Sequence, residues 1–242
     1  MTATIVFVGP TLAAAEVTQR LPGCEVRPPV SVGDVLRLSR RRSVARIAII
    51  DGYFERMAAV WHKEILVALA RGIAVWGAAS MGALRAAELA PFGMIGVGTI
   101  YRAYAAGRLV ADDEVAVAHL PAEYAYAATS DALVDLRDGL TSAGITAKTR
   151  DALIELARRR FYRERSWAQL IADGRDTGIS VRQLDAVAAW RRAHPQHSRK
   201  AADARLLLRR LATSPAARRA RGRTLAVPRT WALRQLEADL DR

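Results

Sequence analysis

Short apolar runs alternate with helix-type segments over roughly the first ninety residues, and this alternation constrains the fold more than any other feature. In such a pattern each apolar run forms a buried strand, and each intervening segment forms a helix that packs on the sheet. The clearest run, from Arg46 to Ile50, ends at Asp51-Gly52. The chain is therefore expected to have an α/β fold with βαβ units, a short parallel sheet and flanking helices. The expected strands are 4–8, 24–27, 46–50 and 73–76, and the expected helices are 11–20, 32–42, 56–71 and 80–90.

From about residue 129 the apolar spacing is helical throughout. The segment 213–230 is basic and contains Pro215 and Pro228, which predicts a linker before a short terminal helix at about 230–240. We therefore expect an α/β core over residues 1–128 and an all-helical C-terminal region over 129–242, with a basic linker near 213–230. The expected helices of this region are 130–141, 146–163, 166–174, 179–193 and 198–212.

The composition is strongly basic, with 37 Lys+Arg against 24 Asp+Glu, a formal net charge of +13 and a pI near 11.0. Hydrophobic residues make up 51% of the chain, which excludes disorder throughout. Basic residues concentrate at 158–165 and 191–234, where aromatic side chains are sparse. We therefore interpret these helices as solvated arginine-rich faces, and a nucleic-acid-binding protein is the least favoured function.

The number of cysteines and the length of the apolar runs indicate the cellular compartment in which the protein is expected. Cys24 is the only cysteine, which excludes an internal disulfide framework and a Cys-based zinc cluster. No apolar run approaches the ~20 residues that a membrane-spanning helix needs. Met1 leads almost directly into the first expected strand, which is not the pattern of a signal peptide. We expect a cytoplasmic protein without membrane contact.

Three polar turns follow the first, third and fourth expected strands. They are Gly9-Pro10-Thr11, Asp51-Gly52 and Gly77 to Ser80. The carboxyl ends of parallel strands meet at one edge of a sheet, which is where α/β proteins bind ligands. The sequence therefore predicts a site at this edge.

Ser80 is the sharpest candidate for a nucleophile, because it lies among small residues between an expected strand and an expected helix. The spacing Gly77-x-x-Ser80-x-Gly82 is one residue longer than the G-x-S-x-G elbow of α/β-hydrolases, so that motif is absent. The start of a helix still offers backbone N–H donors to an oxyanion, here those of Met81 and Gly82. The alternative is that Ser80 only caps the helix.

His62 and Lys63, on the helix before Ser80, are candidates for the base. Neighbouring helix positions point about 100° apart, so we expect only one of the two to face the site. A neutral lysine amine can activate a serine, whereas a guanidinium cannot lose its proton. Lys63 is one of three lysines in a chain with 37 basic residues. The alternatives for Lys63 are a surface position or a salt bridge to Glu64 or Asp51.

Three further groups of residues are weaker candidates. The run Asp112-Asp113-Glu114 offers the oxygen ligands that divalent cations prefer, but such runs are more often solvated loops or helix starts. His119 stands alone, and a lone histidine is more often structural. The glycines at 93, 96 and 98 match neither a P-loop nor a G-x-G-x-x-G fingerprint. We therefore expect no metal and no cofactor.

Several long motifs follow one another over roughly residues 4–140: VFVGPTL at 6–12, GDV at 33–35, DGYF at 51–54, AVWHKEIL at 59–66, GAASMGALRAAEL at 77–89, PFGMIGVG at 91–98, DDEVA at 112–116 and His119. In their order and spacing these motifs resemble the TfuA-like family. One departure is Ala111, at a position before Asp112-Asp113 where an acidic residue is common in the family.

The resemblance implies a partner protein of YcaO enzymes in peptide-backbone thioamidation, in which sulfur replaces an amide oxygen. In that family YcaO activates the amide with ATP. The TfuA-like partner is assigned the hydrolysis of a C-terminal thiocarboxylate on a ubiquitin-like sulfur-carrier protein, which releases sulfide, and it helps YcaO to engage its peptide substrate. The family's Ser–Lys pair corresponds here to Ser80 and Lys63.

Acyl transfer from a thiocarboxylate suits such a pair, since sulfide is the leaving group. Thr11, Asp51 and Arg85 lie on the adjoining turns and helix and are expected to orient it. The small residues Gly77, Ala78, Ala79 and Gly82 are expected to leave room for the carrier's tail. The alternative function is a non-catalytic docking module that recruits peptide or sulfur carrier to YcaO.

Overall fold

The computed structural model describes residues 2–54, 58–215 and 225–240. The chain forms two compact units, which we call the sheet unit (Met1–Val110 with Ala201–Arg242) and the helical unit (Ala111–Lys200). The expected boundary at residue 128 falls inside the helical unit. Residues 216–224 of the expected basic linker lie outside the described residues.

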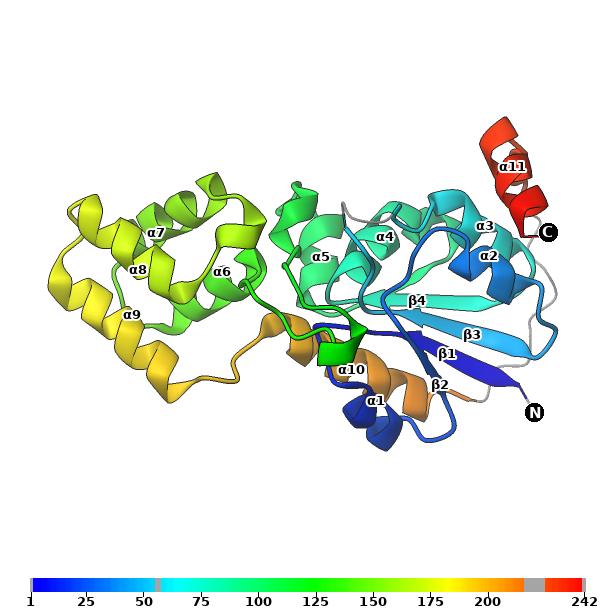
Figure 1. Cartoon of the computed structure of the whole chain (residues 1–242), viewed down its shortest axis with the longest axis horizontal. Coiled ribbons are helices and arrows are strands. Elements are labelled where there is room, and N and C mark those ends of the chain that lie inside the picture. The colour runs from blue at the N-terminus through cyan, green and yellow to red at the C-terminus, as the bar shows by residue number, and fades with distance from the viewer. Residues whose placement is uncertain (1, 55–57, 216–224, 241–242) are drawn as a thin grey trace. The chain divides into compact units, whose positions relative to one another are not determined.

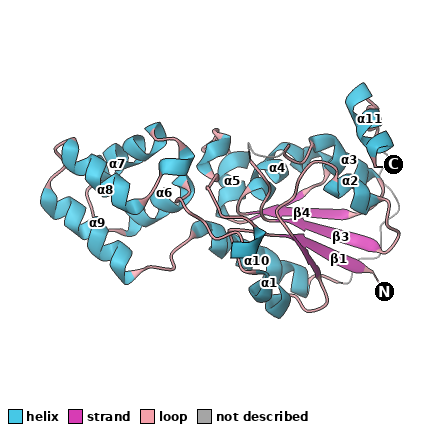
Figure 2. Ribbon diagram, viewed as in Figure 1, coloured by secondary structure: helices cyan, strands magenta, loops and turns pink. Residues whose placement is uncertain are grey.

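The sheet unit contains a five-stranded, all-parallel sheet in the order β2-β1-β3-β4-β5 (Figures 1 and 2). The α/β fold class is therefore confirmed. Strand order reverses between β1 and β3, and ligands of doubly wound sheets bind outside the carboxyl ends at such a point. The fifth strand was not expected, because it has only three residues and includes Gly96. The strands are β1 (Ala3–Phe7), β2 (Glu25–Arg27), β3 (Val44–Ile49), β4 (Ala74–Ala78) and β5 (Ile95–Val97).

The apolar side chains of β1 and β3 alternate between the two faces of the sheet. Ile5, Phe7, Ile47 and Ile49 belong to one core, and their neighbours Val6, Val8, Ala48 and Ile50 belong to the other. This is the two-residue period of a strand that is buried on both sides. Residues of α2, α3 and α4 fill the first core, whereas residues of α1 and α10 fill the second. The helices of this unit are α1 (Ala14–Arg20), α2 (Asp34–Ser39), α3 (His62–Ala70), α4 (Met81–Leu89), α5 (Thr99–Ala105), α10 (Arg199–Thr213, of which the first two residues belong to the helical unit) and α11 (Trp231–Asp239).

Helix α3 begins at His62, later than the expected start at residue 56. Trp61 before it is extended, with φ −80° and ψ 145°, and its backbone N–H donates to the carboxylate of Glu64 at 3.0 Å. A glutamate in the first turn that reaches back to the preceding backbone is a helix-start signal, so it fixes the boundary here. Met57, which was expected on this helix, lies outside the described residues.

The helical unit packs four helices around one apolar core that includes Leu136, Leu153, Leu170 and Leu184. Among the helices that the structure describes in either unit, none has the length and apolar character that crossing a membrane requires. The elements of this unit are the short 3-10 helices η2 (Asp112–Glu114), η3 (Ala122–Tyr124) and η4 (Tyr162–Glu164), and the helices α6 (Leu133–Ser142), α7 (Ala147–Arg159), α8 (Trp167–Asp176) and α9 (Val181–Ala193).

Candidate active site

Asp51 ties together two of the three turns at the carboxyl ends of the strands. Its carboxylate is 1% exposed and accepts hydrogen bonds from the backbone N–H groups of Gly9, at 2.9 Å, and Thr11, at 3.0 Å. The hydroxyl of Thr11 donates a third bond at 2.6 Å. The structure thus brings Thr11 and Asp51 together where strand order reverses, and Asp51 holds the turn after β1 in shape.

Ser80 follows β4 through a tight turn. Its N–H donates to the carbonyl of Ala78 at 2.8 Å, and the intervening Ala79 has a φ of 66°. A bond across three residues with a positive central φ is a γ-turn of the rare, strained kind, and such strain clusters at functional sites. Ser80 is 8% exposed and occupies the N-cap position of α4, but in the described part of the chain its side chain makes no capping bond to that helix.

Two glycines allow α4 to approach the sheet backbone to backbone. A Cβ atom on Gly82 would lie 1.7 Å from the carbonyl oxygen of Ile49, and one on Gly77 would lie 2.0 Å from the carbonyl oxygen of Gly82. Both distances are far inside van der Waals contact, so only glycine fits. The space beside these glycines is filled by the chain's own backbone, and it does not give the room expected for a carrier's tail.

The first turn of α4 presents its N–H groups beside Ser80. Gly82 donates to the carbonyl of Ile50 at 3.3 Å, and Ala83 donates to the carbonyl of Ser80 at 2.9 Å. Of the two expected oxyanion donors, Gly82 is therefore directed at the end of β3. Met81, the first residue of α4, adjoins Ser80 in the chain.

Lys63 lies in the first turn of α3, half-buried, and its amine donates to the hydroxyl of Thr230 at 2.9 Å. Helices α3 and α4 are in contact, so Lys63 and Ser80 stand on neighbouring elements. Among the described residues the structure gives no hydrogen bond between them, and it gives Lys63 no salt bridge to Glu64 or Asp51. The Ser–Lys pair therefore stays a prediction.

His62 and Arg85 meet at the same carboxylate. Glu88 accepts a bond from Arg85 at 2.7 Å and lies 2.8 Å from Nε2 of His62, which is 47% exposed. Arg85 also donates to the carbonyl of Val60 at 3.2 Å. As the helical geometry requires, His62 and Lys63 point different ways: His62 toward α4 and Lys63 toward the C-terminal segment.

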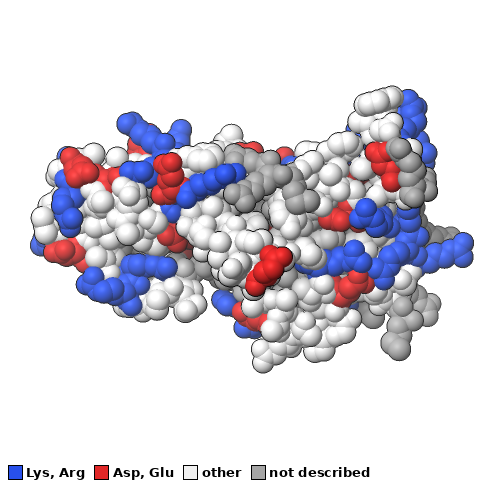
Figure 3. All heavy atoms as spheres, in the orientation of Figure 1, with Lys and Arg blue, Asp and Glu red and all other residues white. Residues whose placement is uncertain are grey.

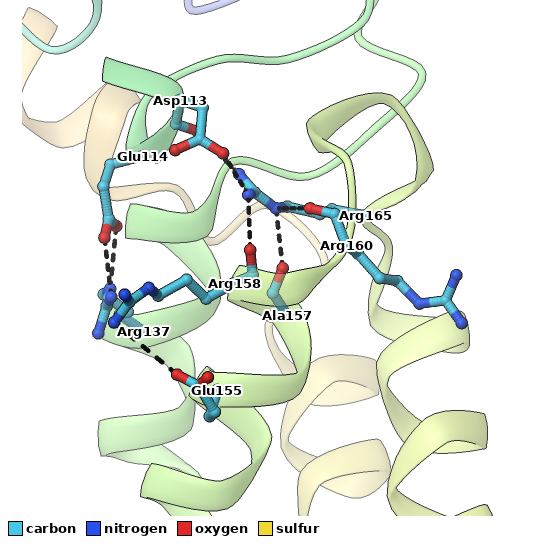
Figure 4. Close-up of polar contacts among 8 residues, drawn as sticks. All are labelled: Asp113, Glu114, Arg137, Glu155, Ala157, Arg158, Arg160 and Arg165. Carbon is cyan, nitrogen blue, oxygen red and sulfur yellow. Dashed lines mark hydrogen bonds and ion pairs between the residues drawn. The ribbon is translucent and has the colours of Figure 1, made fainter. Parts of the chain in front are cut away.

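In the helical unit, Asp113 and Glu114 each pair with an arginine (Figure 4). Arg137 holds Glu114 with two bonds, at 2.9 and 2.7 Å, and Arg165 binds both the carboxylate and the backbone carbonyl of Asp113. His119 bonds to the carbonyl of Leu120 at 2.8 Å. These pairs give the acidic run a structural role. Among the described residues, no group of three or more His, Cys, Asp or Glu side chains is placed to hold a metal ion.

A family model described as TfuA-like protein matches residues 51–166. This stretch, which we call the TfuA-like region, is similar to that family. The match covers nearly half of the chain and includes Ser80, Lys63 and Arg85, while Thr11 and the C-terminal helices lie outside it. A search of curated proteins gives no match. The TfuA-like region supports a role in thioamidation in association with YcaO enzymes.

Two structural residues of the TfuA-like region were missed by sequence reasoning. Glu64 is fully buried, and its carboxylate accepts the backbone N–H groups of Trp61, Gly33 and Leu36, so it joins the starts of α2 and α3. Burial raises the pKa of Glu64, and the three backbone donors oppose that shift. Its place three residues after Trp61 was the signal that could have revealed it.

The second missed residue of the TfuA-like region is Arg165. Its guanidinium is fully buried and donates to the carbonyls of Ala157 at 2.9 Å and Arg160 at 3.1 Å, besides Asp113. These bonds satisfy carbonyls at the end of α7, which otherwise have no helical partner. They also explain why α7 ends at Arg159, where a longer helix was expected. In the sequence Arg165 is one arginine among many, and nothing there distinguishes it.

Proposed function

We propose that this protein hydrolyses the thiocarboxylated C-terminus of a ubiquitin-like sulfur carrier and so supplies sulfide to a YcaO enzyme. Ser80 is the nucleophile and Lys63 is the base. The observation that carries the proposal is the strained turn at Ala79, after which a buried serine begins α4 at the carboxyl ends of the strands. Doubly wound sheets bind their ligands at that edge, and strained backbone clusters at functional sites.

The reaction needs no oxidant or cofactor. The Oγ of Ser80 attacks the carbonyl carbon of the thiocarboxylate while the neutral amine of Lys63 takes the serine proton. The ammonium of Lys63 then gives this proton to the sulfur, the C–S bond breaks and the sulfur leaves as hydrosulfide, which yields a carrier ester on Ser80 and a neutral amine. Water, activated by the same amine, attacks the ester, so the net reaction converts a thiocarboxylate and water into a carboxylate and hydrogen sulfide.

Backbone groups at the start of α4 stabilise the developing oxyanion in this scheme. The N–H of Met81 adjoins Ser80, and the positive end of the helix dipole lies at the same point. Asp51 and Thr11 fix the neighbouring turn, and Arg85 anchors α4 to the carbonyl of Val60. These three residues orient the site and do not react.

One observation favours the alternative, a non-catalytic docking module that recruits peptide or sulfur carrier to YcaO. Among the described residues no hydrogen bond joins the amine of Lys63 to Ser80, although the hydrolase requires the amine to take the proton of that serine. A docking module would bind carrier or YcaO without consuming thiocarboxylate.

Sulfide release from purified, thiocarboxylated carrier separates the two functions. We expect Ser80→Ala to lower the rate by more than ~10³-fold and Lys63→Ala to lower it by ~10²–10⁴-fold. Matched controls are Ser43→Ala and Lys148→Ala, because both residues are exposed and neither lies at the proposed site. The controls should release sulfide at the wild-type rate, and circular dichroism should confirm that all four variants are folded.

Wild-type sulfide release by Ser80→Ala would overturn the catalytic assignment. If the wild-type protein also bound carrier without consuming it, the docking module would be the correct function. Loss of activity in Ser80→Ala but not in Lys63→Ala would keep the nucleophile and assign the base to another residue.

A further inference from the structure

Helix α11, in the C-terminal segment, packs on the rest of the sheet unit. Leu233 is 1% exposed, and Leu236 and Leu240 lie 3.6 and 3.7 Å from the position that a Cβ atom on Gly33 would occupy. Arg40 donates to the backbone carbonyl of Glu237 at 3.1 Å. The helix is thus packed beside the start of α2, although it lies outside the TfuA-like region.

Thr230 has two roles at the start of this helix. It is the N-cap of α11, where its hydroxyl oxygen accepts the N–H of Leu233 at 3.5 Å. The same oxygen accepts a bond from the amine of Lys63 at 2.9 Å. The first turn of α3 is therefore held at two places. Thr230, at the start of α11, binds the amine at the tip of the Lys63 side chain, and Glu64 joins the backbone of the same turn to the start of α2.

A lysine that acts as a base needs its amine fixed in place, because its four-carbon stem is flexible. A hydroxyl can do this in both protonation states, since it accepts from an ammonium and can donate to a neutral amine. A carboxylate would also cap the helix, but it would stabilise the ammonium and oppose loss of its proton. Threonine at position 230 therefore caps the helix and also holds the amine of Lys63 without stabilising its charged form.

We propose that Thr230 is a positioning residue for Lys63, so that the C-terminal helix α11 completes the active site. This inference rests on the proposed function, in which Lys63 is the base. The hydroxyl of Thr230 keeps the amine in one place without fixing its charge. Residues outside the TfuA-like region are therefore required for full activity.

The test compares four substitutions in the full-length chain by the pH dependence of sulfide release. Thr230→Ser keeps the hydroxyl and should match the wild type. Thr230→Val removes the hydroxyl and should lower kcat by about 10-fold or more, because the base is no longer held. Thr230→Asp keeps the helix cap but should move the rising limb of the pH profile to higher pH, since the proton is held more tightly on the amine. Thr230→Asn caps the helix without charge and should leave that limb in place.

A purely structural role for Thr230 predicts a different result. Thr230→Val would then lower only the melting temperature, because the helix cap is lost, and would leave kcat at the wild-type value. Thr230→Asp would give the wild-type pH profile. Either a normal kcat in a folded Thr230→Val or an unshifted profile in Thr230→Asp overturns the inference.

A second measurement does not depend on catalysis. The rate at which an amine-acylating reagent modifies Lys63 can be followed against pH by peptide mass spectrometry, with the exposed Lys148 as the internal control. The inference predicts that Thr230→Asp moves the pH dependence of Lys63 modification upward and leaves that of Lys148 unchanged. Failure of the proposed function would appear as sulfide release that survives Ser80→Ala and Lys63→Ala, whereas failure of this inference would appear as an unshifted Lys63.

Discussion

The two units of this protein use arginine in different ways. The helical unit has 14 Lys+Arg against 13 Asp+Glu, whereas the sheet unit has 23 against 11, so nearly all of the excess charge belongs to the sheet unit. The sequence interpretation assigned the excess to the C-terminal helices. That interpretation holds for residues 201–242, with 10 basic against 4 acidic residues, but the arginines at 158–165 lie in a balanced unit.

In the helical unit several of the described ion pairs connect different elements. Arg160 of the α7–η4 connection binds Asp173 of α8, and Arg199 binds Asp138 of α6. Arg165 has no exposed side-chain surface. Charge in this unit therefore organises the packing of its helices.

In the sheet unit several arginines gather at the amino edge of the sheet, opposite the candidate site. Figure 3 shows basic side chains over the amino ends of the strands. Arg40, Arg41 and Arg42 are exposed in the connection between α2 and β3, and Arg46 donates to the carbonyl of Leu211 rather than to a carboxylate. The apolar faces of the sheet hold the core of this unit together, whereas Arg40 and Arg85 anchor single elements through backbone carbonyls.

The largest expected effect on stability comes from replacing Arg165, the buried arginine of the helical unit. Arg165→Met should lower the free energy of unfolding by about 3–5 kcal/mol, because it leaves Asp113 and several buried carbonyls without their donor. Urea denaturation measures the loss, and hydrogen exchange should locate the new openings in α6–α9. Arg159→Met is the control, since Arg159 is 75% exposed, and should cost less than about 0.5 kcal/mol. Equal loss of protection in the sheet unit would contradict independent roles for charge in the two units.

An intermediate effect should appear in the pH dependence of stability, with opposite signs for one carboxyl group of each unit. The bond from Arg160 lowers the pKa of Asp173, so the stability that the Asp173 carboxylate contributes is present above the ordinary Asp pKa of ~3.9 and is lost as pH falls. Burial raises the pKa of Glu64, so the folded state favours the protonated carboxyl group. The stability that this group contributes is present below the ordinary Glu pKa of ~4.3 and is lost as pH rises. Denaturation of Asp173→Asn and Glu64→Gln between pH 3 and 8 measures both.

Each variant should remove one of these dependences. The stability advantage of the wild type over Asp173→Asn should shrink toward low pH, and its advantage over Glu64→Gln should shrink toward high pH. Parallel curves for the wild type and a variant would show that the corresponding carboxyl has the same pKa in the folded and unfolded states.

The sheet and its carboxyl edge were predictable from sequence because β1, β3 and β4 are short and nearly all apolar, and polar turns follow them. The meeting of Thr11 and Asp51 followed from that arrangement alone. The return of α10 to the sheet was not predictable. The pattern of an amphipathic helix shows that one face is buried, but it does not identify the surface that covers it.

At the candidate site, the features that the sequence could not predict are mainly contacts between segments that lie far apart in the chain. Lys63 was singled out because lysine is rare in this chain, but its bond to Thr230 joins residues 167 positions apart, and no local pattern encodes such a contact. The strain at Ala79 was hidden for a different reason. A positive φ is expected at glycine, and here the chain places alanine there.

The smallest expected effect comes from an exposed arginine of the sheet unit. Arg41 pairs with Glu25 at 3.1 Å, and the two side chains are 41% and 36% exposed. Arg41→Ala should change the free energy of unfolding by less than about 0.5 kcal/mol, because solvent screens the pair. The variant also removes one positive charge from an edge that carries Arg40 and Arg42, which offsets part of the lost attraction. Urea denaturation at low and high salt tests this, since both contributions weaken as salt rises. A loss above about 1 kcal/mol would mean that charge stabilises the sheet unit as it does the helical unit, and the contrast between the two units would fail.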